Sequence, residues 1–273
     1  MTRASTVIRL PAGQLPAVLT VLWAVGLLWL EFRKPLRPVQ DSKLRRGIRN
    51  GVIAACAGAV VQALEVPAAL AASNLVAAYD LGVTRNLPMP QWARAAISVL
   101  LLDYTLYLWH VMTHRVPFLW RFHRVHHMDR EMDATTALRF HFGEMTLSVP
   151  FRVMQVLVIG PTLAQLSAWQ SLLFVSILFH HSNVRIGKTL ERWLQLFVVT
   201  PRLHEIHHSV APEEENSNWS SGLTIWDALH GTLRRERLPT DPLTIGVAGH
   251  LGDEDVRLSR VLKAPFVDAG FRT

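Results

Sequence analysis

The sequence has little cysteine and little charge, and both shortages narrow the class of protein. Its single cysteine, Cys56, lies in an apolar run; it cannot form an internal disulfide, and we interpret it as a buried structural thiol. Charged residues make up 18% of the chain and hydrophobic residues 50%, which is high for a soluble globular protein. The chain has no Gly-rich nucleotide motif, no haem-binding fusion domain and no solenoid-type repeat, so electrons for any redox reaction must come from outside.

Charge is scarce over several long segments. The first, residues 14–31, carries none until Glu31, and further largely apolar segments lie at 51–64, 66–79, 93–109, 145–163 and 165–179. About 18–20 apolar residues match the hydrocarbon thickness of a bilayer. We therefore expect an all-α, integral-membrane bundle of about four transmembrane helices, with a large soluble helical core as the alternative. The first segment is not typical of a signal peptide, because no small-residue cleavage site follows it.

The basic residues are concentrated in one place. The net charge is +7, and seven basic residues crowd one short segment: Arg33, Lys34, Arg37, Lys43, Arg45, Arg46 and Arg49. By the positive-inside rule this segment is predicted to be cytoplasmic. Nucleic-acid binding is the rival explanation of a basic chain, but these charges flank a membrane segment and no recognition motif accompanies them.

The order of apolar and polar segments predicts a topology. Glu65 and Pro67 should interrupt the second membrane helix and leave 68–80 as a separate interfacial helix, and Gly160-Pro161 should join a helical hairpin. The expected elements are a helix at 14–31, a basic loop at 33–50, a helix from about 51, a loop at 81–91, a helix at 92–114 and a hairpin of 145–160 with 165–181. Residues 110–144 and 182–273 would then share the cytoplasmic face. The expected units are an N-terminal transmembrane region with its basic loop (1–95), a catalytic domain (96–235) and a polar C-terminal tail (236–273).

Histidine is the residue in which the sequence is rich. Eleven of the 13 histidines lie between positions 110 and 208. They form two H-x-x-H-H boxes, one H-x-x-x-H box, one adjacent pair and one isolated residue: His123, His126 and His127; His204, His207 and His208; His110 and His114; His180 and His181; and His141. His230 and His250 stand apart, and we interpret them as ordinary polar histidines.

The spacing of these boxes favours metal binding. Residues at i, i+3 and i+4 share one face of a helix, and imidazole is a ligand for Zn, Cu, Fe and Ni. This number of imidazoles is too large for one ion and suits two metals with four or five ligands each. Polar groups at membrane segments are costly, so they mark function. The sequence thus predicts a histidine-rich metal-binding cap at one membrane interface.

The order of the boxes resembles the fatty acid hydroxylase and sterol desaturase superfamily. Shared features outside the boxes are Asp103-Tyr104, Leu119-Trp120, the segment 135–139 followed by His141 and Glu144, Thr200-Pro201, and the closing segment 222–232 with Trp226-Asp227 and Gly231-Thr232. The likeness covers about 100–235 and is closest to bacterial members and the alkylglycerol monooxygenase branch. The chain departs from the pattern at Val111, where Arg is usual, at His180, where Gln is common, and at His230, where Phe is common.

The resemblance implies a membrane-bound, non-haem di-iron enzyme. It would use O2 and external electrons, from a ferredoxin or a cytochrome reductase system, to hydroxylate or desaturate a fatty acyl, sterol or ether lipid. Zinc could replace iron during overexpression. The localisation implied is the bacterial inner membrane, with the active site on the cytoplasmic side. The expected ligands are His110, His114, His123, His126, His127, His181, His204, His207 and His208, with His141 and His180 as weaker candidates.

Carboxylates are expected behind the ligands, since a ligating histidine usually donates its other N–H to a carboxylate or carbonyl. Asp103, Glu144 and Asp227 are the candidates.

Two other functions stay open. The segment His204-Glu205-Ile206-His207-His208 also matches H-E-x-x-H, the zinc protease motif in which Glu205 would be the general base. A non-enzymatic membrane metal-binding protein or transporter is the third possibility.

Overall fold

The computed structural model describes residues 15–39, 41–238 and 243–267, and within them the chain is helical with three isolated β-bridges and no strand. The long helices are α1 (Leu15–Arg33), α2 (Lys43–Val60), α3 (Val66–Tyr79), α4 (Gln91–Arg115), α6 (Phe142–Ile159) and α7 (Leu163–His181). The short helices are α5 (Pro117–His127), α8 (Lys188–Leu194), α9 (Pro201–His207), α10 (Pro212–Glu215), α11 (Ile225–His230) and α12 (Leu258–Val267). The all-α class predicted from the sequence is confirmed.

Four helical segments are long and apolar enough to cross a membrane: Lys43–Tyr79, Gln91–Arg115, Phe142–Ile159 and Leu163–His181. At most 28% of the best apolar stretch of each is buried inside the protein. Since apolar side chains point outwards along their length, a hydrocarbon environment explains them better than a soluble core does. The predicted number of about four transmembrane helices agrees with this result.

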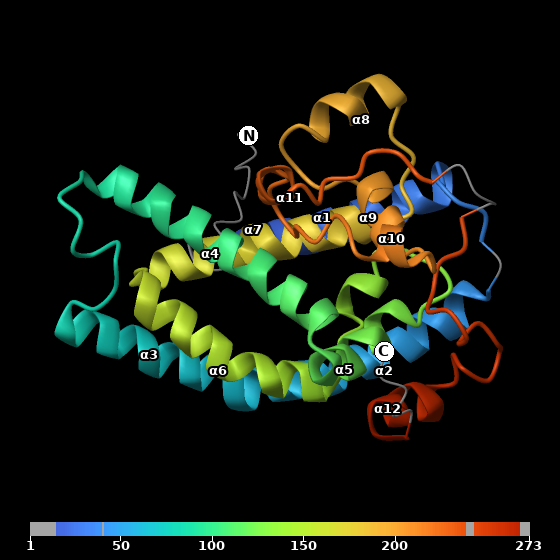
Figure 1. Cartoon of the computed structure of the whole chain (residues 1–273), viewed down its shortest axis with the longest axis horizontal. Coiled ribbons are helices and arrows are strands. Elements are labelled where there is room, and N and C mark those ends of the chain that lie inside the picture. The colour runs from blue at the N-terminus through green and yellow to red at the C-terminus, as the bar shows by residue number, and fades with distance from the viewer. Residues whose placement is uncertain (1–14, 40, 239–242, 268–273) are drawn as a thin grey trace, which may run out of the picture.

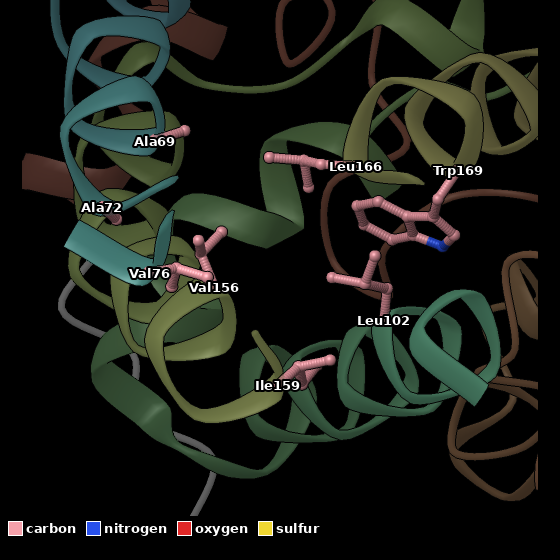
Figure 2. Packing of buried hydrophobic residues seen from close by; sticks show 8 residues of the cluster. All are labelled: Ala69, Ala72, Val76, Leu102, Val156, Ile159, Leu166 and Trp169. Carbon is pink, nitrogen blue, oxygen red and sulfur yellow. The ribbon is translucent and has the colours of Figure 1, made fainter. Parts of the chain in front are cut away.

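The membrane bundle has its apolar core where α3, α4, α6 and α7 meet. The buried residues there are Ala69, Ala72, Val76, Leu102, Val156, Ile159, Leu166 and Trp169. Figure 2 shows Val156 beside Val76, and Leu102 facing the indole of Trp169. The small alanines of α3 allow that helix to approach α6 closely, as small residues do in membrane helix packing.

The segment 80–90 closes one end of the bundle, and it is a loop as predicted (Figure 1). Gly82 and Gly160 have φ of +100° and +74°, a region that favours glycine. A Cβ on Gly82 would lie 2.3 Å from the Cα of Gly160. The two glycines therefore let the loop pack backbone to backbone against the turn between α6 and α7.

The opposite end of the bundle collects the polar elements. The start of α2, the end of α4, the start of α6 and the end of α7 all lie there, with the short helices α5, α9 and α10 beside them (Figure 1). The basic segment contacts the same end, because Arg37 bonds Glu205 and Arg46 bonds Asp129. The expectation that residues 33–50 and the histidine boxes share one side is met in this arrangement.

The prediction that the basic segment is a loop up to residue 50 is wrong. Helix α2 begins at Lys43, with Ser42 as its N-cap. Arg46 and Asn50 lie on its buried face and both donate to Asp129 at 2.9–3.1 Å. Their partner lies about eighty residues away in the chain, so no local pattern could reveal that these residues belong to a packed helix.

The predicted interruption at Glu65 and Pro67 is also wrong, because the helix runs on through both residues. A π-turn, Val61–Glu65, joins α2 to α3 without a break. Pro67 stands in the first turn of α3, where its missing N–H is tolerated because the π-turn displaces the usual hydrogen-bond pairing. Cys56, predicted to be buried, is partly exposed.

Candidate metal centre

Nine of the predicted histidines lie in two adjoining groups at the polar end of the bundle. The first group is His110, His114, His123, His127 and His207; the second is His126, His181, His204 and His208. Within each group every residue offers one ligand atom, and these atoms all lie within 4.8 Å of one another. All nine residues are buried, and no carboxylate belongs to either group in the described part of the chain.

Helical geometry explains how the boxes converge. His110 and His114 share one face at the end of α4, and His123, His126 and His127 span the last turn of α5. Thr200 caps α9 by accepting from the N–H of Leu203, which fixes the turn that presents the last box. The two H-x-x-H-H boxes divide between the groups, and each of them contributes residues to both. The rings of His127 and His208 stack at 4.2 Å and join the groups.

Hydrogen bonds on one ring nitrogen leave the other nitrogen free in the first group. His110 Nδ1 donates to the Trp219 carbonyl at 2.6 Å, and His207 Nδ1 donates to the Ser217 carbonyl at 2.8 Å. His123 Nδ1 donates to the Glu144 carboxylate at 2.8 Å. The Nε2 atoms of these three histidines are buried and have no hydrogen-bond partner. Unpaired buried nitrogens of this kind are costly unless something binds them.

The second group brings ring nitrogens face to face. His181 Nε2 lies 3.0 Å from His126 Nε2 and 2.9 Å from His204 Nε2, while His181 Nδ1 donates to the Ile177 carbonyl. Imidazole nitrogens on one ion bond it at roughly 2.0–2.1 Å and so lie about 3 Å apart. The donor atoms of both groups therefore fit metal ions.

Burial keeps the extramembrane histidines in the form that binds metals. The pKa of His207 falls to about 3, mainly because of burial; the hydrogen bond to the Ser217 carbonyl opposes this shift, and the neighbouring His123 and His181 add to it. Burial and the adjacent imidazoles also lower the pKa of His204 and His208 well below the usual value. A neutral imidazole has a free lone pair, so these side chains can act as ligands near neutral pH.

His141 and His180 lie outside both groups. His141 caps α6: its Nδ1 accepts from the Gly143 N–H at 2.9 Å and its Nε2 bonds the Leu262 carbonyl at 3.2 Å. Since both nitrogens are used, the geometry does not favour His141 as a ligand. His180 packs against His204 with ring centroids 4.1 Å apart and ring planes tilted by 54°. It has a buried, unpaired Nδ1, but its nitrogens do not join either group.

The three predicted carboxylates occupy different positions. Only Glu144 bonds a grouped histidine. Asp227 accepts from the N–H groups of Trp219 and Ser220 at 2.9 Å each, and so fixes the strip whose carbonyls hold His110 and His207. Asp103 accepts from the Leu223 N–H and the Trp226 indole at 3.1 and 2.7 Å. It does not contact His110, although both lie on α4.

The closing segment seen in the sequence acts as a brace for the site. A Cβ on Gly222 would lie 2.4 Å from Asp103 Oδ1, so only glycine allows this close approach. Asn218 has a positive φ of 51° and donates to the carbonyls of Leu203 and Arg234. The carbonyls of Ser217 and Trp219 are functional groups that side-chain reasoning missed. No sequence pattern indicates the positive φ at Asn218 or the backbone conformation of its neighbours.

Glu205 points away from the histidines. Its carboxylate accepts from Arg37 Nη1 at 2.7 Å, and Arg37 also donates to the carbonyls of Met132 and Ser182. A protease base would have to face the water on a metal held by His204 and His208. The structure gives Glu205 a tethering role instead, and the nine grouped histidines exceed what a zinc protease needs. The histidines also gather at one end, rather than along a path across the bundle as transport would require.

A cavity of about 410 Å³ leads from the membrane helices to the histidines. Its apolar wall includes Ala57, Leu106, Phe151, Leu173 and Phe174. At the polar end it reaches grouped residues from both groups: His110, His123, His126, His181 and His204. Tyr104 and Tyr107 do not line it and pack with His230. Trp109 and Phe140 do line the cavity.

Comparison with known proteins supports the family resemblance seen in the sequence. Residues 95–232, just over half of the chain, match the model of the family described as fatty acid hydroxylase. The chain belongs to the fatty acid hydroxylase family. This membership covers the boxes from His110 to His208 and the closing segment up to Thr232.

Several curated relatives from this superfamily are similar in sequence. An ornithine lipid hydroxylase of Rhizobium tropici is 30% identical over 58% of this chain and 48% of its own length. The alkylglycerol monooxygenase of Xenopus tropicalis is 28% identical over 52% of this chain and 30% of its own, and the cholesterol 25-hydroxylase of Mus musculus is 30% identical over 52% and 47%. The alignments thus span less than half of each of these relatives. No solved structure matches significantly.

Proposed function

We propose that this protein is a membrane-bound, O2-dependent di-iron oxygenase that hydroxylates a lipid. The observation that carries the proposal is the meeting of an apolar cavity with two groups of buried histidines, eight of which have a ring nitrogen without a hydrogen-bond partner. Family membership and the named activities of the relatives support a lipid as substrate. Desaturation and ether cleavage are alternative outcomes of the same hydrogen abstraction.

The nine grouped histidines would hold two ions, five ligands on one and four on the other. We assign iron in the working enzyme, with zinc as a substitute after overexpression, because zinc ranks above Fe(II) in affinity for such sites. When bound and reduced, the irons would supply O2 activation and abstraction of hydrogen from an unactivated C–H bond. Two electrons would come from a ferredoxin or a cytochrome reductase system.

The protein's own residues prepare this chemistry. Glu144 keeps the proton of His123 on Nδ1 and so directs its Nε2 lone pair inwards. The Trp219 and Ser217 carbonyls do the same for His110 and His207. Phe140 stacks parallel to His126 with ring centroids 4.7 Å apart, which fixes that ring at the cavity wall. The apolar lining excludes water and aligns a hydrocarbon chain with the histidine end.

The orientation in the membrane forms part of the proposal. The seven basic residues at 33–49 lie at the histidine end, so the positive-inside rule puts the site and the C-terminus on the cytoplasmic side of a bacterial inner membrane. A reporter fused to the C-terminus should be active only in the cytoplasm. Activity on the outer face alone would reverse the orientation.

Lipid analysis of cells with and without the protein tests the function. Expression should produce a lipid heavier by one oxygen atom, under aerobic growth only. The matched variants are His207→Ala, which removes a grouped histidine, and His250→Ala, which removes one outside both groups. The new lipid should vanish with the first and persist with the second. A lipid profile that is the same with and without the protein, across acyl, sterol and ether lipids, would refute the proposal.

A further inference from the structure

One ion pair lies inside the membrane-spanning part of the bundle. Arg152 on α6 donates from Nε to Glu65 Oε1 at 3.2 Å, and both side chains are largely buried. Both residues belong to helical segments long and apolar enough to span a membrane. Ionisable residues at such positions are expensive and usually serve a function.

The hydrogen-bonding atoms of this pair are only partly satisfied by the protein itself. Arg152 Nη1 donates to Gln155 Oε1, and its guanidinium lies over the Trp169 ring at 4.8 Å from the centroid. Within the described residues, Arg152 Nη2 and Glu65 Oε2 have no hydrogen-bond partner. Both residues line the cavity that reaches the histidines. A hydrogen-bond donor and an acceptor therefore remain available at the wall of a mostly apolar cavity.

The helix is deformed where Glu65 enters the cavity. Glu65 is the last residue of the π-turn, and Val61 at the start of the turn also lines the cavity. Pi-turns inside α-helices are rare and are frequent at functional sites. Here the π-turn ends at the residue whose carboxylate lies at the cavity wall.

Two helices give the distance from this pair to the histidine end. On α6, Arg152 follows Glu144 by eight residues, which is about 12 Å along the axis. On α4, Gln155 donates to the carbonyl of Leu102, eight residues before His110. An extended hydrocarbon chain is a zigzag that advances about 1.25 Å per bond, so roughly ten bonds cover this distance.

We propose that Glu65 and Arg152 bind a neutral polar group, a hydroxyl or an amide, on the lipid substrate, roughly ten bonds from the carbon that is oxidised. The pair carries no net charge, so a group that both donates and accepts fits it better than a phosphate or a carboxylate. The statement that the far end carries the oxidised carbon rests on the proposed function. Binding of the polar group itself does not depend on the metals.

Photo-crosslinking tests this binding without any turnover. The probes are a primary alcohol of about twelve carbons with a diazirine at its far end, and the same diazirine alkane without the hydroxyl. Each is irradiated with the full-length protein in nanodiscs, without reductant, and the labelled peptides are mapped by mass spectrometry. The alcohol should label the histidine end of the cavity, near Leu106, Trp109 and Met145, roughly five- to tenfold more than the alkane, as one net hydrogen bond would give.

The variant Glu65→Leu with Arg152→Met removes the hydrogen-bond acceptor and donor together, since removing one would leave the other buried and unpaired. It should lose the preference for the alcohol. The matched control, Asp80→Asn with Arg85→Gln, removes an ion pair at the far loop and should keep it. Equal labelling by both probes in the wild-type protein would overturn the inference, as would a preference that survives in the double variant. A labelling preference without any oxygenated lipid in cells would refute the proposed function but retain this site.

Discussion

Glu144 and His123 form a buried pair in which the imidazole Nδ1–H donates to the carboxylate at 2.8 Å. The two residues come from different helices, α6 and α5, and lie twenty-one positions apart. The bond determines which nitrogen of His123 is free, so Glu144 links the cavity wall to the first histidine group.

Replacement of Glu144 should therefore weaken metal binding. We expect Glu144→Ala to lower metal affinity by about 10–100-fold, the usual cost of losing a hydrogen-bond partner behind a ligand. Glu144→Gln, which can still accept the hydrogen bond, should lose less. Titration with a chelator, followed by elemental analysis, measures the effect. Glu213→Ala alters an exposed glutamate and serves as control; a Glu144→Ala variant that holds metal as tightly as this control would contradict the assignment.

Asp227 should control one metal and not the other. It holds the N–H groups of Trp219 and Ser220, and the carbonyls of this strip orient His110 and His207, which both belong to the first group. We expect Asp227→Ala to reduce the metal content from about two ions per chain towards one. Inductively coupled plasma mass spectrometry gives the stoichiometry. Loss of both ions in parallel, in protein that remains folded by circular dichroism, would argue against two separate sites.

The buried ion pair of Arg46 and Asp129 should be important for stability. Burial by itself would raise the pKa of Asp129, but the guanidinium groups of Arg46 and Arg139 hold it well below its usual range. Because the folded pKa is lowered, the carboxylate contributes stability at neutral pH that is lost as the pH falls towards the folded value. Asp129→Asn leaves Arg46 without its main partner and should cost about 3–5 kcal/mol.

Thermal unfolding in detergent measures this cost. Asp80→Asn, at an exposed ion pair, should change the melting temperature little, since surface pairs contribute about 0–1 kcal/mol. Equal melting temperatures for the two variants would show that the Arg46 cluster does not anchor α2 to the segment after α5.

How far the sequence predicts this arrangement depends on the range of each interaction. The i, i+3 and i+4 spacing of His123, His126 and His127 is local, so the convergence of the boxes could be anticipated. The start of α2 could not, since Arg46 and Asn50 look like loop residues until Asp129 is placed beside them. The π-turn before Val66 is equally hidden, because a proline normally ends a helix and only the tertiary packing shows that it does not.

The ligand candidates show the same limit. His141 resembles its family counterpart in position, but its nitrogens bond the backbone at Gly143 and Leu262, and only the structure shows this. The carbonyls of Ser217 and Trp219 have no side-chain signature, so no motif could predict that they orient His207 and His110. Glu144, in contrast, follows from the rule that ligating histidines bond carboxylates.

Glu205 and His126 separate the oxygenase from the protease. Glu205→Gln preserves a hydrogen bond to Arg37, so lipid oxidation should stay within about tenfold of wild type, roughly 1.4 kcal/mol of barrier. Glu205→Ala should lower thermal stability while activity per bound metal stays in the same range. His126→Ala should abolish product. A protease would lose about 10²–10⁴-fold on removal of its general base and would tolerate loss of His126, and that pattern would overturn the oxygenase assignment.

The most direct test of the central claim is isotope labelling with purified protein. The iron-loaded protein in nanodiscs made from lipids of the host membrane is given reductant, an electron-transfer system and ¹⁸O2, and the lipids are analysed by mass spectrometry. We expect a lipid product that carries one ¹⁸O atom and is absent from His207→Ala and from His208→Ala, which remove a member of each histidine group. Product that takes its oxygen from H2¹⁸O instead, or product formation that survives both substitutions, would contradict it.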